Sequence, residues 1–128
     1  MIIPPVSRYM TKSPHVVGPR DRLTKARSLM RRNQIHHLPV VDSEARLVGI
    51  VSDRDFGAMN DKVVDAMTHD VVTVDANATL DEVVALMQTG RINSVVVTGK
   101  AGIEGIFTAT DAVRALGDLL ERVETGER

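Results

Sequence analysis

The motif GIVSDRD at residues 49–55 returns as GIFTATD at residues 105–111. In each copy a glycine and two apolar residues precede a hydroxyl residue, and aspartate closes the motif. The apolar part is typical of a strand, and a hydroxyl residue followed by Asp is typical of a helix start. We therefore expect a strand that turns directly into a helix, and we expect it twice. The glycines would let another backbone approach closely.

On both sides of this motif, the two halves of the chain match in one register. An offset of 57 positions aligns residues 6–11 with residues 63–68, and Val40 with Val97. After a single deletion in the turn at residues 42–48 the offset becomes 56, which superimposes the two closing motifs. Chance matches between apolar segments would scatter over several registers, so the sequence indicates an internal duplication.

Each half predicts the element order β-α-β-β-α. Short β-branched runs indicate strands, and apolar residues spaced three and four apart indicate amphipathic helices. The predicted elements are strands at 16–17 and 71–74, helices at 23–30 and 80–87, hairpins at 38–51 and 95–107, and closing helices from Asp55 and Asp111. We expect Asn33 and Gly90 to end the first helix of each half in the left-handed conformation.

This order predicts a mixed α/β (α+β) fold of two tandem β-α-β-β-α units packed about a pseudo-twofold axis. The predicted boundaries are 6–59 for the first unit and 63–117 for the second, with 118–128 as a C-terminal helix extension and tail. One such unit buries too little surface for independent stability, so we expect the two to pack sheet against sheet. That packing would create two related clefts between the repeats.

Composition places the chain among globular proteins and argues against several functions. Of 128 residues, 43% are hydrophobic, 26% are charged and 2% are aromatic, and the formal net charge is -1. Because acids and bases interleave and aromatic rings are few, no nucleic-acid surface is predicted. No apolar run reaches the roughly 20 residues that cross a bilayer, so no membrane partner is predicted. Cysteine is absent, and we expect a cytoplasmic location.

Further segments carry a resemblance to a known family. Beside the two closing motifs stand VSRYMT at 6–11, VVDAMT at 63–68 and IHHLPVVD at 35–42. With these the chain resembles a CBS-domain pair, or Bateman module, of the small stand-alone prokaryotic type, over residues 6–117. The resemblance implies a regulatory module that binds adenosine nucleotides between its repeats. One repeat's Asp would hold the ribose, and basic residues of the other repeat would meet the phosphate.

Two unequal sites are predicted on this basis. A carboxylate at a helix start can accept both hydroxyls of a ribose, and hydroxyl and amide donors there can meet an anion. The main site is assigned to Asp111, Thr108, Thr110, His36, His37 and Arg54, with the adenine against Val72 and Thr73. The weaker site is assigned to Asp55, Ser52, Val16, Asn93 and Ser94. It is weaker because the positions that match His36, His37 and Arg54 are uncharged, and a phosphate needs strong donors.

Other interpretations of these residues stay open. Hydroxyl and Asp residues at a helix start are more often N-caps than ligand groups. Adjacent His36 and His37 would point to opposite faces of a strand, so no metal site is predicted. We expect one histidine to be buried and hydrogen-bonded and the other to contact phosphate. In that case the affinity for a nucleotide should rise as pH falls through about 6.5.

No catalytic motif is recognisable, so no enzymatic activity is expected and no cofactor is required. The favoured function is regulatory sensing of AMP, ADP or ATP, although S-adenosylmethionine shares the same adenosine half. The alternative is a protein-interaction module with vestigial nucleotide sites. Its basis is the apolar stripe from Ala112 to Val123, which would form a homodimer through helices. Any further regulated protein would lie on another chain.

Overall fold

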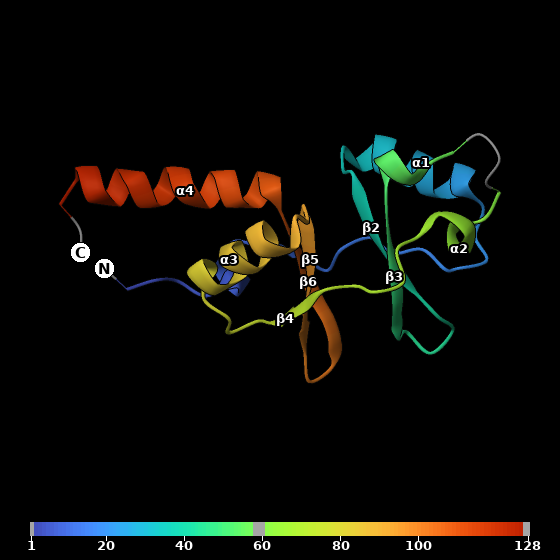
Figure 1. The fold of residues 1–128 in the computed structure, drawn as a ribbon, viewed down its shortest axis with the longest axis horizontal. Coiled ribbons are helices and arrows are strands. Elements are labelled where there is room, and N and C mark those ends of the chain that lie inside the picture. The colour runs from blue at the N-terminus through green and yellow to red at the C-terminus, as the bar shows by residue number, and fades with distance from the viewer. Residues whose placement is uncertain (1, 58–60, 127–128) are drawn as a thin grey trace. The chain divides into compact units, whose positions relative to one another are not determined.

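Two compact units make up the chain, and they cut across the two sequence repeats (Figure 1). The computed structural model describes residues 2–57 and 61–126. The terminal unit comprises Met1–Ser13 and Val72–Arg128, and the central unit comprises Pro14–Val71. The leading segment of each repeat therefore belongs to the unit built mainly from the other repeat. The predicted repeat ends at 58–59 and 127–128 lie outside the described residues.

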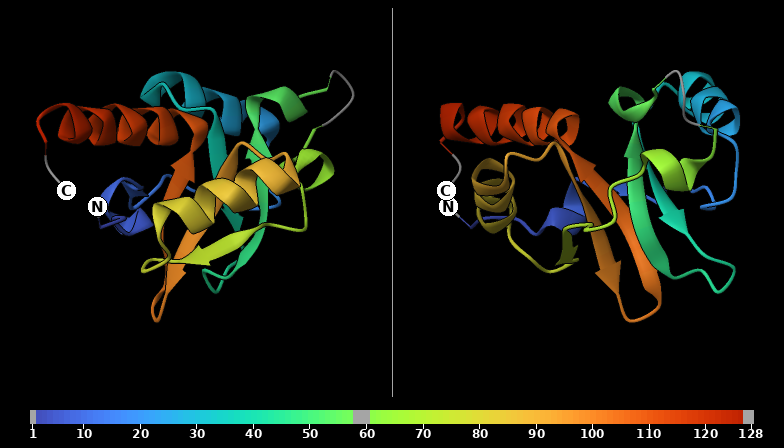
Figure 2. Two further views of the ribbon diagram at one scale, coloured as in Figure 1. Left: turned by 60° about the vertical axis from the view of Figure 1, so that its left-hand side comes forward. Right: turned by 45° about the vertical axis from the view of Figure 1, so that its right-hand side comes forward.

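The terminal unit contains the second repeat's strands and helices from Val72 onward. Strand β4 (Thr73–Asp75) is parallel to β5 (Ser94–Gly99), and β6 (Gly102–Thr108) is antiparallel to β5. A parallel pair requires a crossover connection, and helix α3 (Leu80–Gly90) supplies it. Strand β6 runs directly into the long helix α4 (Ala109–Glu124), as Figure 2 shows. The mixed α/β fold and the order β-α-β-β-α are confirmed for this repeat.

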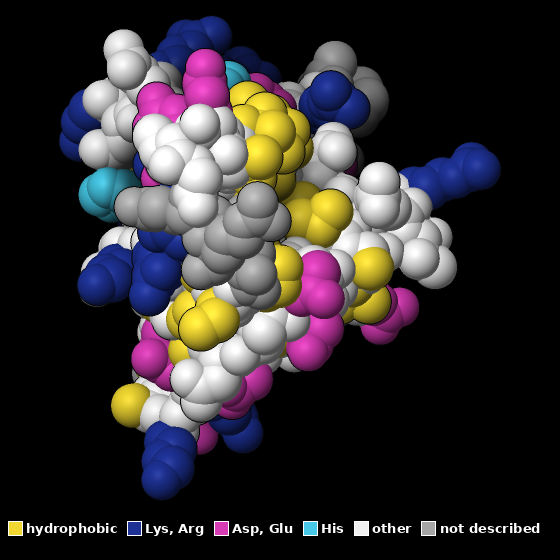
Figure 3. Space-filling view, turned by 90° about the vertical axis from the view of Figure 1, so that its left-hand side faces the viewer, with side chains coloured by type: hydrophobic (Ala, Val, Ile, Leu, Met, Phe, Trp, Pro, Cys, Tyr) yellow, Lys and Arg dark blue, Asp and Glu magenta, His cyan; other side chains and the backbone are white. Residues whose placement is uncertain are grey.

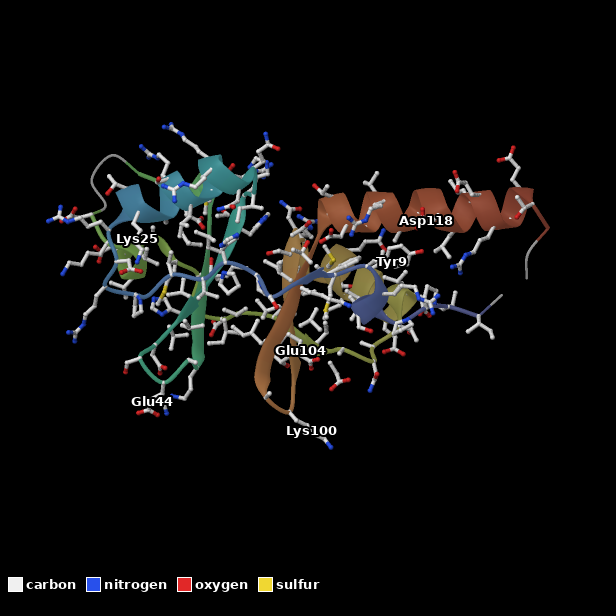
Figure 4. All side chains as sticks on the ribbon, turned by 180° about the vertical axis from the view of Figure 1, so that it is seen from behind. Tyr9, Lys25, Glu44, Lys100, Glu104 and Asp118 are labelled. Atoms are coloured by element: carbon white, nitrogen blue, oxygen red, sulfur yellow. The ribbon has the colours of Figure 1, made fainter. Side chains whose placement is uncertain are left out.

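The first repeat's leading segment completes the terminal unit. It forms a 3-10 turn, η1 (Val6–Arg8), and strand β1 (Thr11–Lys12), which pairs antiparallel with β6 and gives the sheet order β1-β6-β5-β4. Between them, the carbonyl of Tyr9 accepts a hydrogen bond from Arg114 at 2.7 Å. The Tyr9 side chain lies beneath α4 beside Asp118 (Figure 4), and desolvation and a hydrogen bond to Asp118 raise the pKa of Tyr9.

The central unit repeats this plan with less regular strands. Its elements are α1 (Leu23–Asn33), β2 (His37–Val41), β3 (Leu47–Ser52) and α2 (Val63–Ala66). Strands β2 and β3 form an antiparallel hairpin. Val17 pairs parallel with Val40, and Ile50 pairs antiparallel with Thr68, as single bridges in the places that correspond to β4 and β1. The strand predicted at 16–17 is thus reduced to one bridge.

Each unit has its own apolar core. The buried members in the terminal unit are Val6, Tyr9, Leu80, Val83, Met87, Val95, Val97, Phe107 and Ala115. Those in the central unit are Val17, Leu23, Ala26, Met30, Leu38, Val40, Val51 and Val63. Val6 and Val63 are fully buried although each comes from the opposite repeat. The leading segments are therefore structural parts of the units they join, since burying one valine contributes about 1.5–3 kcal/mol.

The first helices end one residue later than predicted. Asn33 and Gly90 are still helical, and the left-handed residues are Gln34, with φ 55°, and Arg91, with φ 53°. The side-chain amide of Asn33 donates to the carbonyl of Leu29 at 2.9 Å, and Gly90 takes the same place in α3 without a side chain. The amides of Gln34 and Arg91 then close the helix ends by bonding back to carbonyls of the last turn.

The closing helix predicted from Asp55 is wrong. Only a single 3-10 turn, η2 (Asp53–Asp55), is present, and Phe56 after it is extended, with φ -80° and ψ 100°. The reason is length, because only residues 56–62 separate η2 from α2. The equivalent helix of the second repeat, α4, runs from Ala109 to Glu124.

The approach of β1 to Gly105 gives the first testable prediction. A Cβ atom at Gly105 would lie 2.8 Å from the carbonyl oxygen of Thr11, so the two strands would have to separate. Gly105→Ala is expected to lower the free energy of unfolding by about 1–3 kcal/mol, the usual cost of overpacking. Urea denaturation followed by circular dichroism measures this change.

Gly117→Ala is the matched control for that measurement. Gly117 lies inside α4, and a Cβ there meets nothing within 4 Å. This variant should raise the stability by about 1 kcal/mol, because alanine is the better helix former. If both glycine variants shift the stability equally, the close approach at Gly105 is not the constraint we describe.

Candidate functional site

Asp111 closes a capping box at the junction of β6 and α4. The amide and the hydroxyl of Thr108 donate to Oδ2 of Asp111, at 3.0 and 3.2 Å, and the Asp111 amide donates to the Thr108 hydroxyl at 3.4 Å. Oδ1 of Asp111 accepts from Arg114 at 3.1 Å, and only 5% of Asp111 is exposed. The N-cap interpretation is thus realised. The Thr108 amide, which we expected to be available to an anion, is engaged by this carboxylate.

Asp55 repeats the arrangement in the central unit. Its Oδ2 accepts from the amide of Ser52 at 2.8 Å and from the Ser52 hydroxyl at 3.1 Å. Asp55 is half-buried, and the turn it closes is the short η2 rather than a long helix. The two closing motifs therefore share their local geometry and differ in burial and in the length of the helix that each one starts.

We expected one histidine to be both buried and hydrogen-bonded, but these two properties are found on different histidines. His36 is 69% exposed in its side chain, and its Nδ1 lies 2.6 Å from Oδ2 of Asp53. His37 begins β2 opposite Ser52 and is half-buried. Burial lowers the pKa of His37, while the charge of Asp53 acts in the opposite direction. Burial and the carboxylate contact thus fall on different histidines, which corrects the expectation that one residue has both.

The predicted site residues at the hairpin ends form two groups, one in each unit. In the central unit His36, His37, Ser52, Arg54 and Asp55 lie at one end of the β2–β3 hairpin. In the terminal unit Asn93, Ser94, Thr108, Thr110 and Asp111 lie at the equivalent end of the β5–β6 hairpin. An equivalent hydrogen bond closes each hairpin end. The amide of Asp53, after β3, donates to the carbonyl of His36 at 3.1 Å, and the amide of Ala109, after β6, donates to the carbonyl of Asn93 at 2.9 Å. The two predicted sites draw on both sets and stay predictions.

The residues predicted to face adenine lie at the strand that opens each repeat. Thr73 is exposed on β4 opposite Val96, and the carbonyl of Val72 accepts the Val96 amide at 3.1 Å. Val16 is partly exposed and borders a hollow of about 730 Å³ within the central unit. The other lining residues of this hollow are Val17, Gly18, Pro19, Arg20, Asp21, Lys25, Val41, Asp42 and Ser43. Val16 therefore has open space beside it.

Sequence reasoning missed two side chains that define these motifs. Arg114 pairs with Asp111, and its position three residues further along a predicted helix could have revealed the contact. Asp53 lies inside the first closing motif, and its carboxylate contacts His36. No local spacing predicts that pair, because it joins the start of one strand to the end of another.

Two features are absent from the described part of the chain. Across residues 2–57 and 61–126, no three His, Asp or Glu side chains gather as a set that could hold a metal ion. Within the same residues, none of the helices combines the length and the apolar character that spanning a membrane demands.

Comparison with known proteins matches the CBS domain family over residues 6–56 and again over residues 63–118. A related protein is the inosine-5'-monophosphate dehydrogenase of Nitrosopumilus maritimus, which is 30% identical over 91% of this chain. The chain spans only 30% of that enzyme's length. The similarity therefore covers one part of a larger protein.

Solved structures with the same fold include two that hold ligands. CBSX2 in complex with AMP is 27% identical, with a TM-score of 0.81 that covers 91% of this chain and 98% of that one. The CBS domain pair of protein MJ0100, in complex with 5'-methylthioadenosine and S-adenosyl-L-methionine, is 26% identical. Its TM-score is 0.86, and the match covers 91% of this chain and 98% of that one.

The unequal burial of the two capping aspartates predicts unequal stability effects. Asp111→Ala should lower the free energy of unfolding by about 1–3 kcal/mol, because it uncaps α4 and leaves buried donors without an acceptor. Asp55→Ala removes the same group from the same motif and should cost about 0.5–1 kcal/mol. Urea denaturation of the two variants measures the difference, and equal losses would contradict it.

Proposed function

Because the chain belongs to the CBS domain family, we propose that it is a non-catalytic regulatory module that binds an adenosine nucleotide between its two repeats. AMP, ADP and ATP are the favoured ligands, and the proposal includes a cytoplasmic location. The observation that carries it is the duplicated capping aspartate, together with basic residues at the equivalent end of the central hairpin. A relative of the same fold binds AMP.

In the main site, the Asp111 carboxylate receives the ribose hydroxyls. An ionised carboxylate offers about four lone-pair positions. The protein uses three of them, through the amide and hydroxyl of Thr108 and through Arg114. The Arg114 side chain is largely exposed, so giving up its contact costs little. A ribose diol can then take its place on Oδ1 while the Thr108 contacts keep the carboxylate in position.

The phosphate is assigned to basic groups of the central unit. His36 is already engaged with Asp53, which leaves Arg54 as the principal cation, with His37 contributing when it is protonated. The matching residues in the terminal unit, Ser94 and Thr110, are uncharged. We therefore propose two sites of unequal strength. The stronger site is at Asp111 and also includes Thr108, Val72 and Thr73. The weaker site comprises Asp55, Ser52, Val16, Asn93 and Ser94.

The positive charge of Arg54 also determines which adenosine compounds the main site favours. A phosphate beside Arg54 is favourable, whereas the sulfonium of S-adenosylmethionine would meet a like charge there. The protein MJ0100 binds both S-adenosyl-L-methionine and uncharged 5'-methylthioadenosine. By the same reasoning, an uncharged adenosine compound suits the Asp55 site of this chain better than a nucleotide does.

A second candidate function rests on a different observation. Helix α4 exposes Val113, Leu116, Leu120 and Val123, four large apolar side chains on one face. Such a face favours a protein-interaction module that forms a homodimer through helices, with nucleotide sites that are vestigial. A wild-type chain that sediments as a monomer at high concentration would contradict this candidate.

Isothermal titration calorimetry tests the nucleotide proposal. Wild-type protein is expected to bind AMP, ADP or ATP, and Asp111→Ala should weaken that binding at least tenfold, because one strong charged hydrogen bond contributes about 1.5–3 kcal/mol. Glu44→Ala removes an exposed carboxylate at the tip of the β2–β3 hairpin (Figure 4) and should leave binding unchanged. Heat from none of these nucleotides, with folded wild-type protein, would refute the proposal.

The affinity for AMP should depend on pH through His37. Burial lowers the pKa of His37 in the free protein, and a bound phosphate would raise it again. Affinity should therefore rise as pH falls below about 6.5, in the interval between the bound and free pKa values. His37→Gln should flatten the profile, and adenosine, which has no phosphate, should show no such rise. A wild-type profile that is flat from pH 8 to about 5.5 would exclude the histidine contact.

A further inference from the structure

Helix α1 is bordered by two adjoining hollows of the central unit. One measures about 570 Å³ and is lined by exposed residues spaced three and four apart on the helix, which we call the arginine face: Thr24, Arg27, Ser28, Arg31 and Arg32. Figure 4 shows nitrogen-tipped side chains that extend from α1 away from β2 and β3. The second hollow measures about 550 Å³, shares Arg27 and Arg31 with the first, and has an apolar part formed by Met30, Ile35 and Phe56. A charged surface and an apolar recess are therefore next to each other.

The arginine face is not neutralised from within the described part of the chain. Across residues 2–57 and 61–126, no ion pair includes Arg27, Arg31 or Arg32. The Arg27 guanidinium instead lies over the ring of Phe56, 5.2 Å from its centre. Among the described residues that line the second hollow, Asp53 is the only acid, and its carboxylate already contacts a histidine. The three guanidinium groups can therefore receive an anion from outside the chain.

The stability of α1 does not explain this charge. A helix dipole favours cations in the last turn, which accounts for Arg31 and Arg32. It does not account for Arg27, which lies one turn before Arg31. Like charges four residues apart repel each other and destabilise a helix. An anion bound between Arg27 and Arg31 would remove that repulsion.

The second repeat shows that the fold does not need cations at this place. With the offset of 57 positions, the residues of α3 that match the three arginines are Val84, Gln88 and Thr89. Helix α3 contains two acidic residues and no lysine or arginine, whereas α1 contains four basic residues and no acid. On the face of the molecule that Figure 3 shows, basic side chains share the surface with acidic and hydrophobic ones. The arginine face is therefore a special property of the first repeat.

Its composition favours the carboxylates of a protein over nucleic acid or lipid. A guanidinium binds a carboxylate through two parallel hydrogen bonds. Nucleic acid is disfavoured because the chain has a net charge of -1 and only 2% aromatic residues. A lipid surface is disfavoured because Thr24 and Ser28, the other members of the face, are polar and would not insert among acyl chains. The apolar recess beside Phe56 fits one apolar side chain of a protein segment.

We propose that the arginine face of α1 is the docking surface for an acidic segment of the protein that this module regulates. Carboxylates of that segment bind Arg27, Arg31 and Arg32, and one apolar side chain enters the recess beside Phe56. The proposal rests on the regulatory function proposed above, because regulation requires a partner, and it adds where the partner binds and what its chemistry is. The arginine face shares no residue with either proposed nucleotide site.

Fluorescence anisotropy with a synthetic probe tests the docking. The probe is a labelled peptide in which a leucine is flanked on both sides by glutamates and aspartates. Wild-type protein should bind it, and the affinity should fall as salt is raised. The variant with Arg27→Gln and Arg31→Gln should bind about tenfold more weakly, because two pairs between guanidinium and carboxylate are lost. A peptide with serine in place of the leucine should also bind more weakly, because it leaves the apolar recess unfilled.

The matched control removes two cations from the terminal unit. Lys12→Gln with Lys100→Gln makes the same change in net charge and should leave peptide binding unchanged. The arginine variant should fold as the wild type does, because Val84 and Gln88 occupy the matching places in α3. Circular dichroism checks the folding of both variants.

Several results would overturn the proposal. They are a wild type that binds no peptide at low salt, an arginine variant that binds it as well as wild type does, and a control variant that loses it equally. Tighter arginine-dependent binding of a single-stranded RNA oligonucleotide, or of phosphatidylglycerol vesicles, would assign the face to another class of partner. Self-association that the arginine variant abolishes would assign it to a second copy of the chain.

Calorimetry with AMP separates this proposal from the nucleotide site. The arginine variant should bind AMP as wild type does, whereas Asp111→Ala should lose AMP and keep the peptide. A wild type that binds the peptide and no nucleotide would refute nucleotide sensing and support the docking surface. One that binds AMP and no peptide would do the reverse.

Discussion

Each leading segment approaches a glycine in the last strand of the opposite repeat, and this contact determines much of the remaining architecture. Gly105 lies against Met10 and Thr11, and Gly49 lies against Met67 and Thr68. Any side chain at either glycine would meet a backbone carbonyl of the incoming strand. The contact adds β1 to the terminal sheet and Thr68 to the central hairpin. It also fixes where each closing strand ends, and hence where each capping aspartate stands.

Under the proposed function, the capping aspartate has two roles that need the same atoms. At position N3 it accepts the backbone amide of the N-cap residue, and as a ligand group it would accept the hydroxyls of a sugar. Asp111 resolves this competition by dividing its oxygens, since Oδ2 receives both donors of Thr108 and Oδ1 receives only the exposed Arg114. The same Arg114 also donates to the carbonyl of Tyr9. If the proposed ligand binds at Asp111 and displaces Arg114, it would loosen one attachment of α4 and so link the site to the helix.

Much of the fold could be predicted from the sequence, because the duplication reports each element twice. Apolar spacing located α1 and α3, and the paired closing motifs located β3 and β6. Both helix ends differed by one residue, because the left-handed conformation falls on Gln34 and Arg91 rather than on the Asn and Gly residues that favour it. The helix predicted from Asp55 failed because residues 56–62 must already lead into α2. Because the two closing motifs are alike, their residues did not indicate that only residues 56–62 separate the first motif from α2.

Two local contacts among the candidate residues could be predicted from the sequence, and the contact between His36 and Asp53 could not. Spacing alone placed Thr108 with Asp111 and Ser52 with Asp55, and the hydrogen bonds agree with that spacing. The contact of His36 with Asp53 depends on the register of β2 against β3, which a pattern of residue types does not specify. Unequal burial of His36 and His37 likewise results from packing rather than from strand alternation alone.

The exchange of leading segments makes each repeat depend on the other. A single repeat on its own would carry a leading segment whose burial site lies in another repeat, and its own core would lack a valine in the place of Val63 or Val6. Two such single repeats could satisfy each other only by domain swapping. Within one polypeptide the exchange is intramolecular, so it is part of folding and does not depend on protein concentration.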